Sequence, residues 1–359
     1  MNNPLGLGLV YAGPDIAWTI ARDVFVGASK VAVYSAHNGS KLINKGDISS
    51  DELGVHIEAK EDGSVVNKAG ASIFGATGVT TGMVASRDMT VVNHGEIFGK
   101  ELAGVSATDV SGFNLRNDGD IFGAQAGVYT QTGHPDSQSG PTIKNAGHIH
   151  SDVYGIYAQA IPGLTATVVN KAGGVIEGEV QAIRTTPGHL ALDNRGKIKG
   201  DVFSAAESDK VVNRGKIKGE VFLNGGDDVY RSKDGKAGLV HGGDGNDKLH
   251  AGGARDKFVF DTKLDAASNV DIVKHFDSAK DTVFLDLSIF AALTGPGALA
   301  ASEFHKGKQA ADADDHVIYD RTTGALAYDP DGNGDIAQTL FANIGKGLHL
   351  DSSAFTVVA

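Results

Sequence analysis

The sequence predicts an all-β protein whose first two thirds form a parallel β-helix, with one turn of chain for each repeat. Three observations lead to this fold class. Glycine accounts for 49 of 359 residues, about twice the usual share of ~7%, without the strict third-residue period of collagen. A short phrase of Asn, one or two residues, Gly and an aliphatic residue recurs along the chain. The segments around it are short, β-branched and bounded by glycine, and none has helical spacing.

The repeated phrase has a period typical of a solenoid. Its asparagines are separated by 23, 26, 24, 28, 25, 24 and 19 residues, and self-similarity at such a period indicates stacked structural repeats. We expect a right-handed parallel β-helix over residues 41–222, in which the Ile after each glycine points into the core. The asparagines, in chain order, are Asn44, Asn67, Asn93, Asn117, Asn145, Asn170, Asn194 and Asn213.

Each asparagine is expected to have a structural role rather than a catalytic one. Asn tolerates the left-handed backbone of a tight corner, and the glycine after it is expected to take the most strained position. Stacked on its counterparts in neighbouring turns, the asparagine amide can also hydrogen-bond along the column.

Residues 1–40 are expected to form an N-terminal cap or first turn, because the open end of a solenoid must be covered. The candidate cap is residues 1–22, in which Trp18 is expected to be a packing residue. The first basic residue is Arg22, and Gly6 and Gly8 interrupt the apolar stretch before it, so this segment does not have the pattern of a cleaved secretory signal. The sequence has no apolar run near the ~20 residues needed for a transmembrane segment.

Composition excludes several functions. A net charge of −12 argues against nucleic-acid binding, which needs a concentrated basic patch. Residues 223–359 carry 13 Lys and Arg against 21 Asp and Glu, a difference of −8, so most of the acidity lies there. Such acidity is typical of regions that bind a hard divalent cation. The absence of cysteine excludes disulfides, zinc–thiolate sites and thiol nucleophiles.

A calcium-binding motif begins after residue 223. Residues 242–250 match the nonapeptide Gly-Gly-x-Gly-x-Asp-x-apolar-x at every defined position, residues 251–259 are a degenerate copy, and residues 225–230 are a shortened one. Asp228 and Asp247 are 19 residues apart, so they should lie on the same side in adjacent turns and hold a Ca²⁺ ion between them. Asp256 should face the opposite side, where the partner turn at 233–238 matches the motif poorly. The candidate calcium ligands are Gly225, Gly226, Asp227, Asp228, Gly242, Gly243, Asp244, Gly245, Asp247 and Asp256.

The C-terminal part as a whole resembles the C-terminal module of RTX (haemolysin-type calcium-binding) proteins. The segments that carry the resemblance are 252–260, 269–276, 281–286, 311–320 and 324–334. The resemblance implies a calcium β-roll over 223–260, followed by a small β-rich C-terminal cap over 261–359. It also implies export by the type I secretion machinery through an uncleaved signal near Ala354–Ala359, and calcium-driven folding outside the cell.

The segment Asp329-Pro-Asp331-Gly-Asn333-Gly-Asp335 has two interpretations. Its alternating oxygen side chains resemble the start of an EF-hand loop, with Gly334 at the sixth position, but Leu340 stands where that loop needs Glu. The alternative is a hairpin turn between residues 325–328 and 339–341.

An enzymatic site would require charged groups on one outer face of the β-helix. The residues before each repeated Ile should point outward and form a column, in which Glu96 and Asp120 are neighbours and His148 is one turn further on. Two neighbouring carboxylates would raise one pKa or bind a cation. The column reads Asp47, Ser72, Glu96, Asp120, His148, Val175, Lys197 and Lys216.

Two further features of this column bear on function. Lys197 and Lys216 are expected to lie too far along the stack to assist Glu96, and no Asp-Pro-His-Glu motif of the uronate epimerases is present. His148, His150 and Asp152 share one strand face, so they form either a transition-metal site or surface decoration.

Together these patterns predict a secreted, calcium-binding β-solenoid at or outside the cell surface. Its expected role is a surface, biofilm or matrix protein that binds polysaccharide or a cell surface. The alternative is a polysaccharide lyase or uronate epimerase acting on the outer face of the β-helix. A third hypothesis is end-to-end self-association of the solenoid.

Overall fold

The computed structural model describes residues 6–82, 86–134 and 136–359, and Met1–Leu5 of the expected N-terminal cap lie outside the described residues. The protein is all-β, with 51% of residues in strands and 2% helical, and forms a β-solenoid of about 11 turns with parallel stacked strands. This confirms the predicted fold class. The chain divides into two compact units, residues 1–204 (unit 1) and 205–359 (unit 2), so the expected boundary at residue 222 lies inside unit 2.

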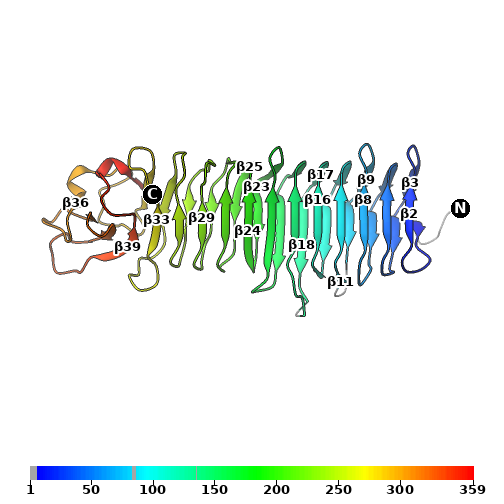
Figure 1. Ribbon diagram of the computed structural model, residues 1–359, viewed down its shortest axis with the longest axis horizontal. Coiled ribbons are helices and arrows are strands. Elements are labelled where there is room, and N and C mark those ends of the chain that lie inside the picture. The colour runs from blue at the N-terminus through cyan, green and yellow to red at the C-terminus, as the bar shows by residue number, and fades with distance from the viewer. Residues whose placement is uncertain (1–5, 83–85, 135) are drawn as a thin grey trace. The chain divides into compact units, whose positions relative to one another are not determined.

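Each coil of unit 1 adds a strand to three parallel stacks, which run through the blue to green part of Figure 1. The first stack contains β2 (Ala17–Ile20), β5 (Lys41–Asn44), β8 (Ser64–Asn67), β12 (Thr90–Asn93), β16 (Asn114–Asn117), β19 (Thr142–Asn145), β22 (Thr165–Asn170) and β24 (His189–Asn194). The second contains β3 (Phe25–Ala28), β6 (Asp47–Ser50), β9 (Ser72–Gly75), β13 (Glu96–Gly99), β17 (Asp120–Gly123), β20 (His148–Ser151) and the first parts of β23 (Val175–Thr185) and β25 (Lys197–Phe203).

The third stack follows a bend in each coil. It contains β1 (Leu7–Val10), β4 (Val31–Ser35), β7 (Leu53–Ile57), β10 (Thr77–Thr81), β14 (Ala103–Thr108), β18 (Ala126–Thr132), β21 (Tyr154–Ala160) and the later parts of β23 and β25. Two short strands, β11 (Ser86–Arg87) and β15 (Val110–Ser111), pair beside these stacks.

The core of unit 1 is a set of aliphatic columns, because strand residues alternate between the inside and the outside. The repeated isoleucines all point inward and are at most 1% exposed, as predicted: Ile48, Ile73, Ile97, Ile121, Ile149, Ile176 and Ile198. The residues on either side of each Ile therefore face outward, which sets the position of every side chain in the candidate column.

A continuous ladder of asparagine amides runs through unit 1, as the sequence predicts. The Nδ2 of Asn44 donates to the Oδ1 of Asn67 at 2.9 Å, and Asn67 donates in turn to Asn93 at 2.9 Å. The same bond links each later pair at 2.9 to 3.0 Å, through Asn117, Asn145, Asn170 and Asn194. All these side chains are 0% exposed, so the ladder supplies partners for amides that would otherwise be buried without them.

The glycines two residues after five of the ladder asparagines are required for a different reason than expected. In the described part of the chain, neither the ladder asparagines nor Gly46, Gly95, Gly119, Gly147 and Gly196 have positive φ, so the prediction of left-handed or strained backbone is wrong at these positions. It is correct for Gly70 and Gly173, in the two longer copies of the phrase, which have φ +77° and +86°. A Cβ on Gly95 would instead lie 2.2 Å from the carbonyl oxygen of Ala71, and one on Gly147 would lie 2.0 Å from that of Gly119. Glycine is therefore needed because the backbones of adjacent coils approach too closely for any side chain.

The N-terminal residues continue the same stacking. β1, β2 and β3 pair in parallel with β4, β5 and β6, so residues 7–28 form the strands of a terminal coil. Trp18 on β2 stacks on Tyr11 with ring centroids 4.6 Å apart. This contact fits the packing role predicted for Trp18.

Unit 2 has two parallel stacks and a mixed C-terminal region. One stack contains β26 (Lys210–Asn213), β29 (Val229–Arg231), β31 (Lys248–His250), β33 (Asp271–Lys274) and β39 (Thr339–Asn343). The other contains β28 (Val221–Phe222), β30 (Val240–His241), β32 (Lys257–Phe260), β34 (Thr282–Asp286) and β40 (Phe355–Val358). The remaining elements are β27 (Lys216–Ile217), β35 (Gly297–Ala298), the 3₁₀ turn η1 (Ala301–Glu303), β36 (Phe304–Lys306), β37 (Val317–Asp320), β38 (Ala325–Tyr328) and the 3₁₀ turn η2 (Ser352–Ala354).

Removing one amide from the ladder should destabilise unit 1. Asn117→Ala leaves the Nδ2 of Asn93 and the Oδ1 of Asn145 without their ladder partners, and each unsatisfied buried group costs about 1–3 kcal/mol. We expect a loss of about 2–4 kcal/mol in the free energy of unfolding, measured by urea titration with circular dichroism. The control is Asn114→Ala on the same strand, where the side chain is exposed and, among the described residues, bonds to the Gly112 carbonyl alone. Equal effects of the two substitutions would show that the ladder is not stabilising.

Candidate functional site

The predicted outward column is present on the second stack of unit 1. Parallel pairing places Glu96 beside Asp120 and Asp120 beside His148, in direct register. The pairs Asp47–Ser72, Ser72–Glu96, His148–Val175 and Val175–Lys197 complete the column within unit 1. The sequence therefore predicts correctly which outward residues are neighbours.

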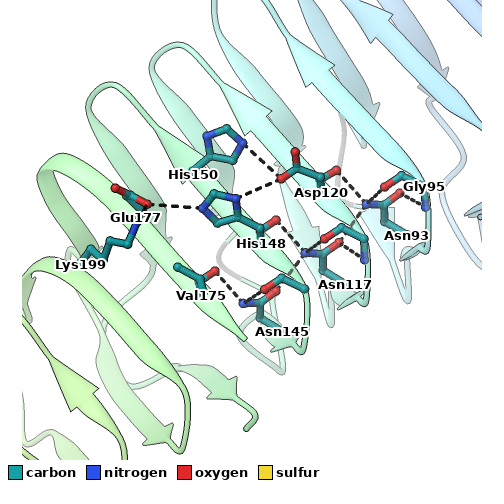
Figure 2. Close-up of polar contacts among 12 residues, drawn as sticks. Asn93, Gly95, Asn117, Asp120, Asn145, His148, His150, Val175, Glu177 and Lys199 are labelled. Atoms are coloured by element: carbon teal, nitrogen blue, oxygen red, sulfur yellow. Dashed lines mark hydrogen bonds and ion pairs between the residues drawn. The ribbon is translucent and has the colours of Figure 1, made fainter. Parts of the chain in front are cut away.

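The asparagine ladder holds the backbone of this column in place (Figure 2). The Nδ2 of Asn93 donates a second hydrogen bond to the Asp120 carbonyl at 3.0 Å, and Asn117 does the same to the His148 carbonyl at 3.0 Å. Asn145 bonds the Val175 carbonyl at 2.9 Å. Because the ladder is buried and continuous, it fixes the backbone positions from which the side chains of the column project.

Asp120, His148 and His150 converge on this face from two adjacent strands, β17 and β20 (Figure 2). The Oδ1 of Asp120 lies 3.4 Å from the Nδ1 of His148 and 3.2 Å from the Nε2 of His150. The two imidazoles are stacked, with ring centroids 4.2 Å apart and planes within 8°. The three side chains are partly exposed, but the Oδ1 of Asp120 and the Nε2 of His150, which face each other, are themselves enclosed.

Two residues extend the cluster on the far side of His148. The Nε2 of His148 lies 3.5 Å from the Oε2 of Glu177, and Lys199 forms an ion pair with the same carboxylate (Figure 2). Glu177 is next to His150 in register, and Lys199 is next to Glu177. The cluster is thus a chain of alternating acidic and basic groups across four coils.

Electrostatics follow from this alternation. The imidazole of His150 and, less strongly, that of His148 lower the pKa of Asp120. Lys199, helped by His148, lowers the pKa of Glu177. Desolvation and the neighbouring His150 lower the pKa of His148, although Asp120 and Glu177 oppose that shift. Of the two outcomes expected for the neighbouring carboxylates, a raised pKa is therefore not found at Asp120.

The cluster differs from the expected arrangement in two residues. Asp152 follows the end of β20 and is exposed, and the acidic member of the cluster is Asp120 on the neighbouring strand. Lys199, which the predicted column does not include, reaches the cluster through Glu177. Asp120 takes part because parallel pairing places it beside His148, and Lys199 takes part because the same pairing places it beside Glu177.

A second candidate site lies in unit 2, where aspartates line one edge of the stacked turns. The backbone N–H of Asp228 donates to the Oδ1 of Asp247 at 2.9 Å, and that of Asp247 donates to Asp271 at 3.0 Å. Asp209 donates in the same way to Asp228. These aspartates, here called the aspartate ladder, are between 0% and 3% exposed. Asp228 and Asp247 therefore lie on the same side in adjacent turns, as predicted.

The two glycine-rich turns stack directly on each other. Gly225 pairs with Asp244, and the Gly226 N–H donates to the Asp244 carbonyl at 2.9 Å. Gly243 has φ +99° and Gly245 has φ +127°, and a Cβ on Gly243 would lie 1.7 Å from the Asn224 carbonyl oxygen. Glycine is therefore required at both positions, by backbone conformation and by close approach.

The remaining predicted ligands divide into exposed and buried groups. Asp227 and Asp244 are exposed at the turns, and the Oδ1 of Asp227 accepts the N–H of Asn246 at 2.9 Å. Gly242 is buried, and a Cβ there would lie 2.3 Å from the Oδ2 of Asp247. The carboxylate of Asp247 therefore projects into space that only a glycine leaves open.

Asp256 lies on another edge, beside the turn at 232–235. Its Oδ2 accepts the Gly252 N–H at 2.7 Å, and the Gly253 N–H donates to the Lys233 carbonyl. This is the partner turn that the sequence predicts. In the next coil Asp281 accepts the Asp256 N–H at 2.9 Å, so the edge carries two buried carboxylates.

Sequence reasoning missed Asp209, Asp271 and Asp281 as members of these edges. A common signal was present, because every aspartate in both edges is followed by one residue and then a buried apolar or aromatic one. Asp271 and Asp281 follow longer turns than the nonapeptide, which is why the nine-residue motif does not find them.

Burial strongly disfavours the charged form of these carboxylates. Desolvation, reinforced by neighbouring aspartates, raises the pKa of Asp228 to about 9 and that of Asp247 to about 6. Desolvation and Asp247 also raise the pKa of Asp271 well above its ordinary value. Among the described residues, the Oδ2 atoms of Asp228 and Asp247 have no hydrogen-bond partner. The ladder therefore needs protons or a cation.

The segment at 329–335 is the loop of a hairpin. β38 pairs antiparallel with β39, with Tyr328 opposite Thr339, so the hairpin interpretation is confirmed. Asp329 is buried and accepts the Asp331 N–H at 3.4 Å, and Asp331 in turn accepts the Ile336 N–H at 3.1 Å.

Comparison with known proteins gives no match: no family model, curated protein or solved structure is significantly similar to this chain. In the part of the chain that the structure describes, no helix is long and apolar enough to cross a membrane.

In cation-free protein, unit 2 should lose stability as pH rises. A carboxyl group whose pKa is raised by folding stabilises the fold while it is protonated, and this stabilisation disappears as pH rises through the folded-state pKa. The loss should run from about pH 4 through the pKa of Asp247 near 6 to that of Asp228 near 9. The measurement is hydrogen exchange of residues 224–250 in chelator, corrected for the intrinsic pH dependence. Protection that increases with pH would contradict the expectation.

Proposed function

We propose that this protein is a secreted β-solenoid of the RTX type that binds calcium in unit 2. The observation that carries the proposal is the aspartate ladder, whose buried carboxylates project unpartnered oxygens between stacked glycine-rich turns. Calcium prefers six to eight oxygen ligands, and carboxylates and backbone carbonyls are its usual protein donors.

The residues between the turns suit this ion. Asp228 and Asp247 would supply buried carboxylate oxygens, and the turns at 225–227 and 242–245 would supply carbonyls and the exposed carboxylates of Asp227 and Asp244. Thiols and imidazoles are absent from these segments. On the other edge, Asp256 and Asp281 form a second, smaller candidate for the same ion.

Calcium would stabilise the folded state of unit 2. Without it, buried carboxylates must be protonated or must repel one another, which disfavours the folded state. With it, their charge is neutralised and folding is coupled to ion binding. This coupling fits a protein that is exported unfolded through a type I system and folds where calcium is abundant.

The outer surface of unit 1 supports a role in binding polysaccharide at a cell surface or in a matrix. Tyr129, Tyr154 and Tyr157 line a groove of about 370 Å³ on the third stack. Arg184 lies over the Tyr157 ring, 5.9 Å from its centroid. Flat aromatic faces with a few polar groups are suited to sugar rings, and the Arg184 guanidinium favours an acidic sugar.

Calcium binding should be visible in the exchange of unit 2. We expect added calcium to slow hydrogen exchange of residues 224–286, because saturation at 100 times the Kd stabilises a fold by about 2.7 kcal/mol. Identical exchange with calcium and with chelator would overturn the proposal.

The variant Asp247→Asn tests whether Asp247 is a calcium ligand or only a buried carboxylate that stabilises the turn. The amide oxygen can still accept the Asp228 N–H, but the charge is lost. Exchange in chelator should therefore be equal to that of the parent or slower, whereas the calcium concentration needed for protection should rise by at least about 10-fold. The control is Asp314→Asn, an exposed aspartate of the same unit, which should change neither value. A calcium response in Asp247→Asn equal to that of the parent would exclude this residue as a ligand.

Incubation of calcium-loaded protein with acidic polysaccharides tests the role of unit 1. We expect binding without formation of unsaturated uronate, and loss of that binding in Tyr154→Ala. The control is Tyr34→Ala. Tyr34 belongs to the outward column of the third stack that also contains Tyr129 and Tyr157, but it lies two coils from Thr77, the lining residue of the groove on the nearest coil, and four coils from Tyr129. Unsaturated uronate that disappears in a Glu96→Gln/Asp120→Asn variant would instead establish the lyase alternative. Absence of both signals would overturn the polysaccharide role.

A further inference from the structure

The cluster of Asp120, His148 and His150 on unit 1 differs in chemistry from the aspartate ladder. It combines two imidazoles with one carboxylate, and imidazole nitrogens prefer zinc and similar first-row ions, whereas calcium and magnesium prefer oxygen alone. This cluster therefore needs an explanation that is independent of calcium.

The spacing of the donor atoms fits a small tetrahedral ion. Zinc lies about 2.0–2.1 Å from nitrogen and oxygen ligands, so two ligands of a tetrahedral ion are about 3.3 Å apart. The Oδ1 of Asp120 is 3.4 Å from the Nδ1 of His148 and 3.2 Å from the Nε2 of His150. Both distances from the carboxylate are thus close to the separation that a shared ion would impose, and all three donor atoms lie within 4.8 Å of one another.

Two of the donor atoms lack a hydrogen-bond partner among the described residues. The Oδ1 of Asp120 and the Nε2 of His150 are enclosed, and neither has a well-aligned hydrogen bond within the described residues. Their 3.2 Å approach is an ion-pair contact rather than an aligned hydrogen bond. A metal ion would satisfy both atoms at once.

The Nε2 of His148 faces a carboxylate, which is a usual second partner of metal-bound histidines. A histidine that binds a metal through one ring nitrogen commonly donates its other N–H to a carboxylate, which orients the ring. The Nε2 of His148 lies 3.5 Å from the Oε2 of Glu177, and Lys199 holds Glu177 in an ion pair. With the Nδ1 of His148 toward the ion, Glu177 is a positioning residue.

We infer that Asp120, His148 and His150 bind a zinc-like divalent ion on the outer face of unit 1, with Glu177 orienting His148. The two imidazole rings are stacked within 8° of parallel, so ion binding would require them to open from this stack until both nitrogens point at the ion. The protein supplies three ligands, and the fourth position is open to water or to a ligand group from solution. Sites with three protein ligands and an open position are typical of zinc that acts on a bound molecule.

The test is a zinc titration of the untagged, calcium-loaded full chain, followed by calorimetry and repeated with Co²⁺, whose visible spectrum reports tetrahedral geometry. We expect one site that excess calcium does not displace. His148→Gln and His150→Gln should each weaken zinc binding by at least about 100-fold, since loss of a ligand exceeds the 10–100-fold effect of losing its outer partner. Glu177→Gln should weaken it by about 10-fold while leaving the shape of the Co²⁺ spectrum unchanged.

The matched control is His94→Gln. His94 lies on the same unit and makes a similar ion pair, 3.3 Å from Asp118, but no third ligand joins it in the described residues. Zinc affinity should be unchanged in this variant and also in Asp247→Asn, which separates the inference from the calcium proposal. Zinc binding by the His148→Gln/His150→Gln double variant equal to that of the parent, or an equal loss in His94→Gln, would overturn the assignment.

Discussion

The buried chain of asparagine amides is the interaction on which unit 1 depends. Each Nδ2 bonds the next Oδ1 and also a carbonyl of the following coil, so one side chain connects two coils at two points. Strand pairing alone would tolerate a shift along the strand, but a shift here would leave several buried amides unsatisfied at once. The fixed register then brings outward residues from distant parts of the chain, such as Asp120 and His148, into reproducible contact.

The repeated Asn and Ile were sufficient to predict the fold and the outward column, because the number of residues between two repeats is the length of one coil. The role of the glycines was not predictable in the same way, since close approach between coils depends on the path of a neighbouring backbone. The site was predicted only in part for a similar reason. Strand alternation identifies His148 and His150 as neighbours, but that Asp120 contacts both depends on side-chain conformations across coils. The nonapeptide motif did not identify Asp271 and Asp281 as members of the acidic edges, because the turns that precede them are longer than those of the motif.

The carboxyl groups discussed above have opposite pKa shifts in the two units. On unit 1 the acids Asp120 and Glu177 are paired with imidazoles or an ammonium group, and their pKa values fall. In unit 2 the aspartates are stacked on one another away from water, and their pKa values rise. The paired charges on unit 1 do not make its fold depend on a cation, whereas a buried acidic stack makes the fold of unit 2 dependent on pH or on a cation. The second arrangement suits a unit whose folding responds to its surroundings.

The asparagine amides also give unit 1 an electrical direction. Every Nδ2 in the ladder donates toward the C-terminal side, so the amide dipoles add, whereas the alternating peptide dipoles of β-strands largely cancel. A coil that joins this stack continues it only with the same orientation. A coil in the opposite orientation would place donor against donor or acceptor against acceptor in a buried position. Within unit 1 the ladder therefore accepts coils of one orientation only, and it begins one coil inside the N-terminal end, where Ile20 occupies the same column beside Asn44.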